Sequence, residues 1–142
     1  METNVSPESR KLAGILLIIL PTVMFGGVSI LTLLIGTPGY MQNELRQDLW
    51  RAGHAHAGVL LLLSLIALRF VDEASLGDGA KRFVRASIPS AAIFLPLAFF
   101  FSVLTPDATE PNGMIYLAYV GAVILATGVL VLGIGLVKQP RA

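Results

Sequence analysis

The residues best suited to chemistry are the two histidines, His54 and His56, which stand one residue apart in the stretch RAGHAHAGVL. Imidazole binds zinc, copper, nickel and haem iron, and it exchanges protons near neutral pH. Two positions along an ideal helix correspond to about 200° of rotation, so on a helix the two rings point to nearly opposite faces. In an extended segment they share one side and can hold one ion together. The point where the helix begins therefore decides between one ligand and two.

A helix that begins near Asp48, with Asp48 as its N-cap, makes His56 the expected ligand. In that register His56 looks toward the other helices of the bundle, whereas His54 turns toward the loops. The residues beside His56 are small, among them Ala52 and Gly53. Small residues leave room for a flat macrocycle, and they leave room equally for a neighbouring helix.

Carboxylates near the histidines are candidate metal ligands. Two imidazoles with one or two carboxylates can hold a transition metal such as copper or zinc. The closest in sequence are Glu44 and Asp48, and two more, Asp107 and Glu110, follow a later apolar segment. The predicted metal site comprises His54 and His56 together with Glu44 and Asp48.

Haem b is the other cofactor that these residues suit. A six-coordinate haem needs axial ligands on both faces, and a single His56 supplies one of them. The second ligand is expected to be Met24, Met114 or His56 of a second copy. The chain has no cysteine, which excludes thiolate metal sites, disulfides and covalently attached c-type haem. Two other interpretations stay open, namely histidines that only hydrogen-bond to the loops, and a path for protons or substrate.

The elements that must position these residues are membrane-spanning helices. The chain is 55% hydrophobic and 13% charged, whereas a soluble domain has about 25% charged residues. Apart from the histidines and a terminal Arg69, charge is absent from four segments: 12–36, 52–70, 86–104 and 114–137. Each is near or above the roughly 18 residues that a helix needs to cross a bilayer. We therefore predict an all-α fold, a four-helix transmembrane bundle in one domain over residues 1–142.

The distribution of basic residues predicts how this bundle is oriented. Lysine and arginine gather on the cytoplasmic side of membrane proteins. With four spans, the two termini and the middle loop share one side, and that side carries eight of the ten Lys and Arg residues. Both termini are therefore expected in the cytoplasm, with loops 37–51 and 105–113 outside. The expected location is the plasma membrane of a bacterium, and the histidines then lie at the outer end of the second span.

Three connecting segments have recognisable patterns. Residues 1–9 are polar and are expected to be mobile. The stretch YMQNELRQDLW, residues 40–50, places apolar residues at nearly helical spacing, which indicates a short amphipathic helix on the membrane surface. The segment 71–85 contains DEASLGDGAKR and is expected to be a solvated connector.

The last apolar segment carries glycines seven residues apart, at positions 121, 128 and 135. Heptad spacing keeps them on one face of a helix, where the absence of side chains lets a neighbouring helix approach closely. We expect this face to serve helix packing.

The stretch LIGTPGYMQNELRQDLWRAGHAHAGVLLLL resembles the first outer loop and the start of the second helix in haem–copper oxidase subunit I. The resemblance places Pro38–Gly39 at the turn and implies that His56 ligates a low-spin haem. That family has many more spans and histidines, and this chain has no histidine left for a copper centre. The chain is also similar to small four-helix bacterial membrane proteins in which His-x-His opens the second helix, which implies architecture alone.

The function expected from these residues is a haem or metal site at the outer end of the second span, used for electron transfer. The alternatives are an accessory or structural subunit of a larger membrane complex, and a small transporter or channel. Catalysis by the chain alone is not expected, because it offers no nucleophile–base pair. The expected partners are the lipid bilayer and either further copies or a larger complex. A net charge of +1 indicates no nucleic acid.

Overall fold

The computed structural model describes residues 5–138. All the regular secondary structure in these residues is helical, and they contain no strand. Two short helices accompany the long ones: α2 (Pro38–Met41) and the 3-10 helix η1 (Gly113–Tyr116). The long helices are α1 (Pro7–Gly36), α3 (Glu44–Phe70), α4 (Asp78–Ser102) and α5 (Leu117–Val137). Four helical segments, with η1 and α5 counted as one, are long and apolar enough to cross a membrane, as predicted.

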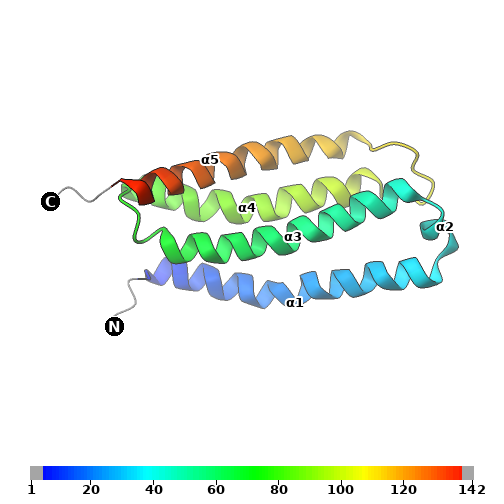
Figure 1. Ribbon diagram of the computed structural model, residues 1–142, viewed down its shortest axis with the longest axis horizontal. Helices are drawn as coiled ribbons and strands as arrows, with labels where there is room; N and C mark the ends of the chain where they lie inside the picture. Colours follow the sequence, from blue (N-terminus) through cyan, green and yellow to red (C-terminus); the bar gives the residue numbers. More distant parts are fainter. Residues whose placement is uncertain (1–4, 139–142) are drawn as a thin grey trace.

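The four long helices lie side by side in chain order (Figure 1). The principal contacts join α1 to α3, α3 to α4 and α4 to α5, and α3 also touches α5. As a result, α1 lies at the edge of the bundle, and the most apolar 18-residue window of α1 contains no buried residue. The protein core is therefore built by α3, α4 and α5.

Two apolar clusters form this core. The cluster toward the chain termini contains small and branched residues: Ala67, Val71, Ala74, Val84, Ile88 and Leu132. The cluster nearer the other end consists of Leu60, Ala91 and Leu95. Burial of these side chains fixes which faces of α3 and α4 meet, and it thereby fixes where the residues around them point.

The glycine face of α5 packs closely, as expected, and its neighbours belong to the same chain. A β-carbon built on Gly121 would lie 2.9 Å from Leu95 Cδ1, and one on Gly128 would lie 3.0 Å from Ile88 Cγ1. A β-carbon on Gly135 would lie 2.8 Å from Leu76 Cδ2. The face therefore seats α5 on α4 and on the loop before α4.

Helix α3 begins at Glu44, earlier than in either alternative, so the alternative in which Asp48 is the N-cap was wrong. Asn43 is the N-cap, because its Oδ1 accepts a hydrogen bond from the backbone N–H of Arg46 at 3.0 Å. Residues 44–50 are the first turns of the long helix, so the separate surface helix over 40–50 was also wrong. Only Pro38–Met41 forms a short helix there.

The segment 71–85 is not the solvated connector that was expected. Helix α4 already begins at Asp78, and Val71, Ala74 and Val84 are buried. The polar N-terminal segment is likewise ordered from Val5 onward, because α1 begins at Pro7 with Ser6 as its N-cap. Residues 1–4 of that segment lie outside the described part of the chain.

Candidate functional site

Both histidines lie on a regular stretch of α3, well after its first turn. Their rings therefore point to different faces, which rules out the arrangement in which an extended pair clamps one ion. The expectation that His54 turns toward the loops was wrong, because its half-buried ring meets α1. His56 meets α4, as expected of a ring that faces the bundle, but it is exposed.

His54 packs into a notch on α1 made by two glycines. A β-carbon on Gly27 would lie 2.8 Å from His54 Nε2, and one on Gly26 would lie 3.7 Å from Nδ1. The imidazole therefore occupies the volume that a side chain would take. Within residues 5–138 neither ring nitrogen of His54 makes a hydrogen bond.

His56 has a defined hydrogen bond and a defined neighbour. Its Nδ1 lies 2.7 Å from the carbonyl oxygen of Ala52, one turn earlier. A carbonyl can only accept, so Nδ1 carries the proton and the neutral ring keeps its lone pair on Nε2. The ring also packs on Phe99 of α4, with centroids 5.0 Å apart. Histidine ligands of metals typically donate their second N–H to such a carbonyl.

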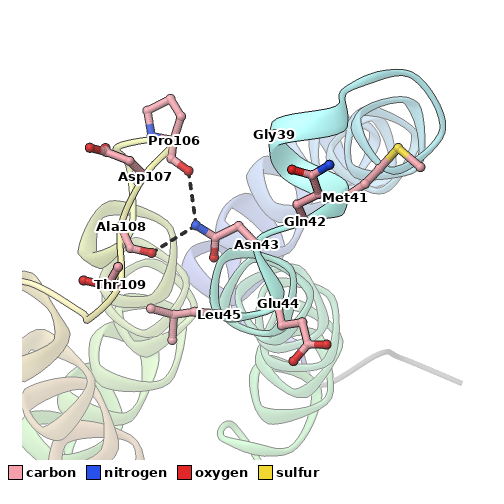
Figure 2. A pocket seen from close by; sticks show the side chains of 10 residues that line it. All are labelled: Gly39, Met41, Gln42, Asn43, Glu44, Leu45, Pro106, Asp107, Ala108 and Thr109. Carbon is pink, nitrogen blue, oxygen red and sulfur yellow. Dashed lines mark hydrogen bonds between the residues drawn. The ribbon is translucent and has the colours of Figure 1, made fainter.

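The candidate carboxylates do not gather around the histidines. Asp48 pairs with Arg51 at 3.1 Å on the exposed face of α3. Glu44 and Asp107 line an open cleft of about 600 Å³. Asn43 crosses this cleft, because its Nδ2 donates to the carbonyl oxygens of Pro106 and Ala108 in the loop after α4. Figure 2 shows their carboxylates pointing in different directions. In the part of the chain that the structure describes, no three His, Cys, Asp or Glu side chains form a group that could hold a metal ion.

The candidate sulfur ligands belong to other elements. Met24 is an exposed residue of α1, and Met114 is an exposed residue of η1. Helix α1 packs on α3, whereas η1 packs on α4 and α5, so the two methionines lie toward opposite edges of the bundle. Glu110 is exposed in the loop between α4 and η1.

Arg46 is a buried residue that sequence reasoning missed. Its side chain is 8% exposed, and its Nε donates to the carbonyl oxygen of Val103 at 3.1 Å. The guanidinium also lies 4.6 Å from the ring centroid of Trp50. The carbonyls that end α4 have no helical partners, and a cation at a helix C-terminus satisfies them and complements the dipole. The sequence signal was the polar pattern 43–51, which also fitted a surface helix.

Tyr40 lies beneath this arginine and has an unusual hydroxyl. The ring is 1% exposed, and its hydroxyl has no hydrogen-bond partner among the residues described. Burial raises the pKa of Tyr40 above its ordinary value, although the nearby charges of Arg51 and Arg46 oppose the rise. The backbone around it is held by Gln47, whose Nε2 donates to the Tyr40 carbonyl at 3.0 Å.

A second polar cluster lies at the opposite end of the bundle and was also missed. Asp72 and Arg85 form an ion pair in which the side chains are 9% and 10% exposed. Arg85 Nε donates to Ser9 Oγ at 3.0 Å, and Asp72 accepts from the backbone N–H of Ser6 at 3.0 Å. Burial by itself raises the pKa of Asp72, but the hydrogen bonds and the charge of Arg85 outweigh it, so the pKa is lowered. This cluster ties the start of α1 to α4.

The chain matches no protein-family model, no curated protein and no solved structure.

Proposed function

We propose that this chain is an integral membrane protein that binds haem b through His56 and takes part in electron transfer. The observation that carries the proposal is the hydrogen bond from His56 Nδ1 to Ala52, which leaves Nε2 with its lone pair on an exposed ring. A bound haem supplies a one-electron couple.

Haem fits this donor set better than copper or zinc. A zinc site typically takes three or four protein ligands, whereas haem iron needs one on each face. Residues 5–138 bring no three suitable side chains together, while one oriented imidazole is present. The role of His56 is to ligate the iron, that of Ala52 is to orient the ring, and that of Phe99 is to pack against it.

The second axial ligand is proposed to be His56 of a second copy. The two methionines of the same chain lie on α1 and η1 rather than beside His56 on α3. His56 is exposed, so it can meet a symmetry-related partner. A two-fold interface presents the same residue from both sides, which suits a cofactor with two equivalent faces.

The proposed location is the bacterial plasma membrane, with both termini in the cytoplasm. Seven of the nine Lys and Arg residues described belong to the end that carries the termini and the α3–α4 connection. This distribution follows the positive-inside rule. His56 then lies in the outer half of its span.

The test is the visible spectrum of the protein purified in mild detergent from haem-replete cells. The wild type is expected to show a Soret band, His56→Ala is expected to lose it, and the matched control His54→Ala is expected to keep it. Two chains per haem would support the shared site. A colourless wild type, or equal haem loss in both variants, would contradict the proposal, and elemental analysis of the same sample would report copper or zinc instead.

A second candidate function is that of an accessory subunit in a larger membrane complex. The observation in its favour is the most apolar window of α1, in which no residue is buried within the described part of the chain. The glycine face of α5 does not support it, because α4 and Leu76 already cover that face. Recovery of a lone monomer in mild detergent would count against this candidate.

A further inference from the structure

Two adjoining hollows lie between the beginnings of α1 and α4, at the end of the molecule that carries the termini. They share the side chains of Glu8, Arg82 and Arg85. The outer hollow, of about 520 Å³, extends to Lys81 and to the acidic residue Asp78. The other, of about 550 Å³, extends to Lys11 and then along apolar residues. Together they form one cleft, which we call the α1–α4 cleft.

The cations of the α1–α4 cleft are of two kinds. Arg85 is held by Asp72 and lies 3.2 Å from Glu8 Oε2, and Lys81 Nζ donates to the Asp72 carbonyl at 3.0 Å. Lys11 on α1 and Arg82 on α4 are exposed and form no salt bridge within residues 5–138. The cleft therefore presents two uncommitted cations from two helices, beside an arginine whose position is already fixed. Such an arrangement suits a phosphate group.

The inner part of the cleft is apolar. It is lined by Leu12 and Ile15 of α1 and by Ala86 of α4. These residues lie where the apolar segments of their helices begin, and α1 makes its principal contacts with α3 rather than α4. A ligand that fits the whole cleft thus has an anionic head and an apolar tail.

We propose that the α1–α4 cleft binds an anionic phospholipid, with its phosphate between Lys11 and Arg82 and an acyl chain along Leu12 and Ile15. Basic pockets between helices on the cytoplasmic side are known to hold anionic head groups. The buried Asp72–Arg85 pair keeps the start of α1 against α4, so the cleft is formed before lipid arrives. A soluble phosphate would use the same cations without the apolar wall.

The experiment measures lipid binding to the full chain by native mass spectrometry from detergent. The probes are a short-chain phosphatidylglycerol, a phosphatidylcholine with the same chains, and glycerol 3-phosphate. We expect phosphatidylglycerol to bind at least about tenfold more tightly than phosphatidylcholine, since each basic residue near an anionic lipid contributes about a fivefold change in affinity. Glycerol 3-phosphate is expected not to compete at the same concentration.

The matched variants locate the site. The double variant Lys11→Gln with Arg82→Gln is expected to weaken phosphatidylglycerol binding about thirtyfold. The control is the double variant Arg69→Gln with Lys138→Gln, which removes the same charge from the same end of the molecule but outside the cleft. This control is expected to leave phosphatidylglycerol binding unchanged. Lys11→Arg with Arg82→Lys keeps the charge and is expected to retain binding. Equal loss in the two neutralised variants, equal affinity for the two lipids, or full competition by glycerol 3-phosphate would overturn the proposal.

Discussion

The carbonyl oxygen of Ala52 gives the two histidines different chemical characters. It accepts from His56 Nδ1 at 2.7 Å and so assigns the proton to that nitrogen, whereas His54 has no such bond among the residues described and is wedged against glycines. The sequence distinguishes the two rings only by the face that each takes on a helix, and it does not show which neighbour each face meets. The difference arises because α3 turns His54 toward α1 and His56 toward Phe99.

Asp72→Asn is expected to reduce the free energy of unfolding by about 3 kcal/mol at neutral pH. The reason is that Arg85, which is 10% exposed, would keep its charge while losing its buried partner. Unfolding in detergent by a denaturing surfactant measures the change. The control is Glu73→Gln, which removes an exposed partner of Arg69 and is expected to cost less than about 1 kcal/mol.

The pH dependence of stability gives a separate readout of the same pair. Because the pKa of Asp72 is lower in the folded state than its ordinary value of 3.8, the unfolded chain binds the proton more tightly. The stabilisation is therefore complete well above pH 3.8 and is lost as the pH falls through and below that value. The Asp72→Asn variant is expected to lack this part of the destabilisation by acid. The measurement is the free energy of unfolding against pH, and parallel curves for the wild type and the variant would show the prediction to be wrong.

Tyr40→Phe is expected to leave stability unchanged or to raise it by about 1 kcal/mol. A buried hydroxyl without a partner costs free energy, and phenylalanine keeps the ring contact with Trp50, whose centroid lies 5.6 Å away. Thermal unfolding in detergent, with Tyr40→Ala as the cavity-forming comparison, measures both changes. A clear loss of stability in Tyr40→Phe would mean that the hydroxyl bonds to a group such as a bound water.

Among the helices, the glycine face of α5 is the feature that the sequence predicted best. Heptad spacing of small residues predicts close packing, whichever helix becomes the neighbour. The start of α3 was predicted poorly, because Asn43 and Asp48 are both good N-cap residues. The choice between them depends on burial of Arg46 and Gln47 against α4 and α2, which no local pattern contains.

Gly128→Ala is expected to destabilise the α4–α5 packing by about 1–3 kcal/mol. The added β-carbon would lie 3.0 Å from Ile88 Cγ1 and 3.2 Å from Ser87 Cβ, so the helices must separate. The matched control is Gly133→Ala on the same helix, where nothing lies within 4 Å of the new atom. That variant is expected to be neutral or slightly stabilising, since alanine favours helix over glycine. Equal effects in unfolding measurements would exclude the packing explanation.

Helix α1 packs on α3, and two close contacts fasten it to the rest of the molecule. One is the notch in which His54 meets Gly27, and the other is the cluster in which Ser9 meets Arg85. Within the described residues, no residue in the most apolar window of α1 is buried, and many of its large side chains are exposed. The least firmly packed helix is therefore the one that lipid, a second copy or another subunit is free to contact.

Gly27→Val is expected to loosen α1 without unfolding the core. A side chain at this position would displace the imidazole of His54 and push α1 away from α3, which is its principal neighbour. Hydrogen exchange in detergent is expected to rise several-fold in α1 while α4 is unchanged. Gly14→Val, on the same helix with nothing within 4 Å, serves as the control. Faster exchange in both variants, or in α4 as well, would contradict this view of α1.

The sequence by itself determined the four apolar helices and the glycine face, because uninterrupted apolar length and residue spacing are local properties. It also restricted imidazole chemistry to His54 and His56, with the helical and the extended arrangement both left open. Only the tertiary structure decided that His54 fills a notch on α1, that His56 bonds to its own helix beside Phe99, and that Asp72 and Arg85 are buried together. The physical reason is that burial and contacts with other helices depend on elements far away in the chain, and the packing of α1 and α4 against α3 brings those elements together.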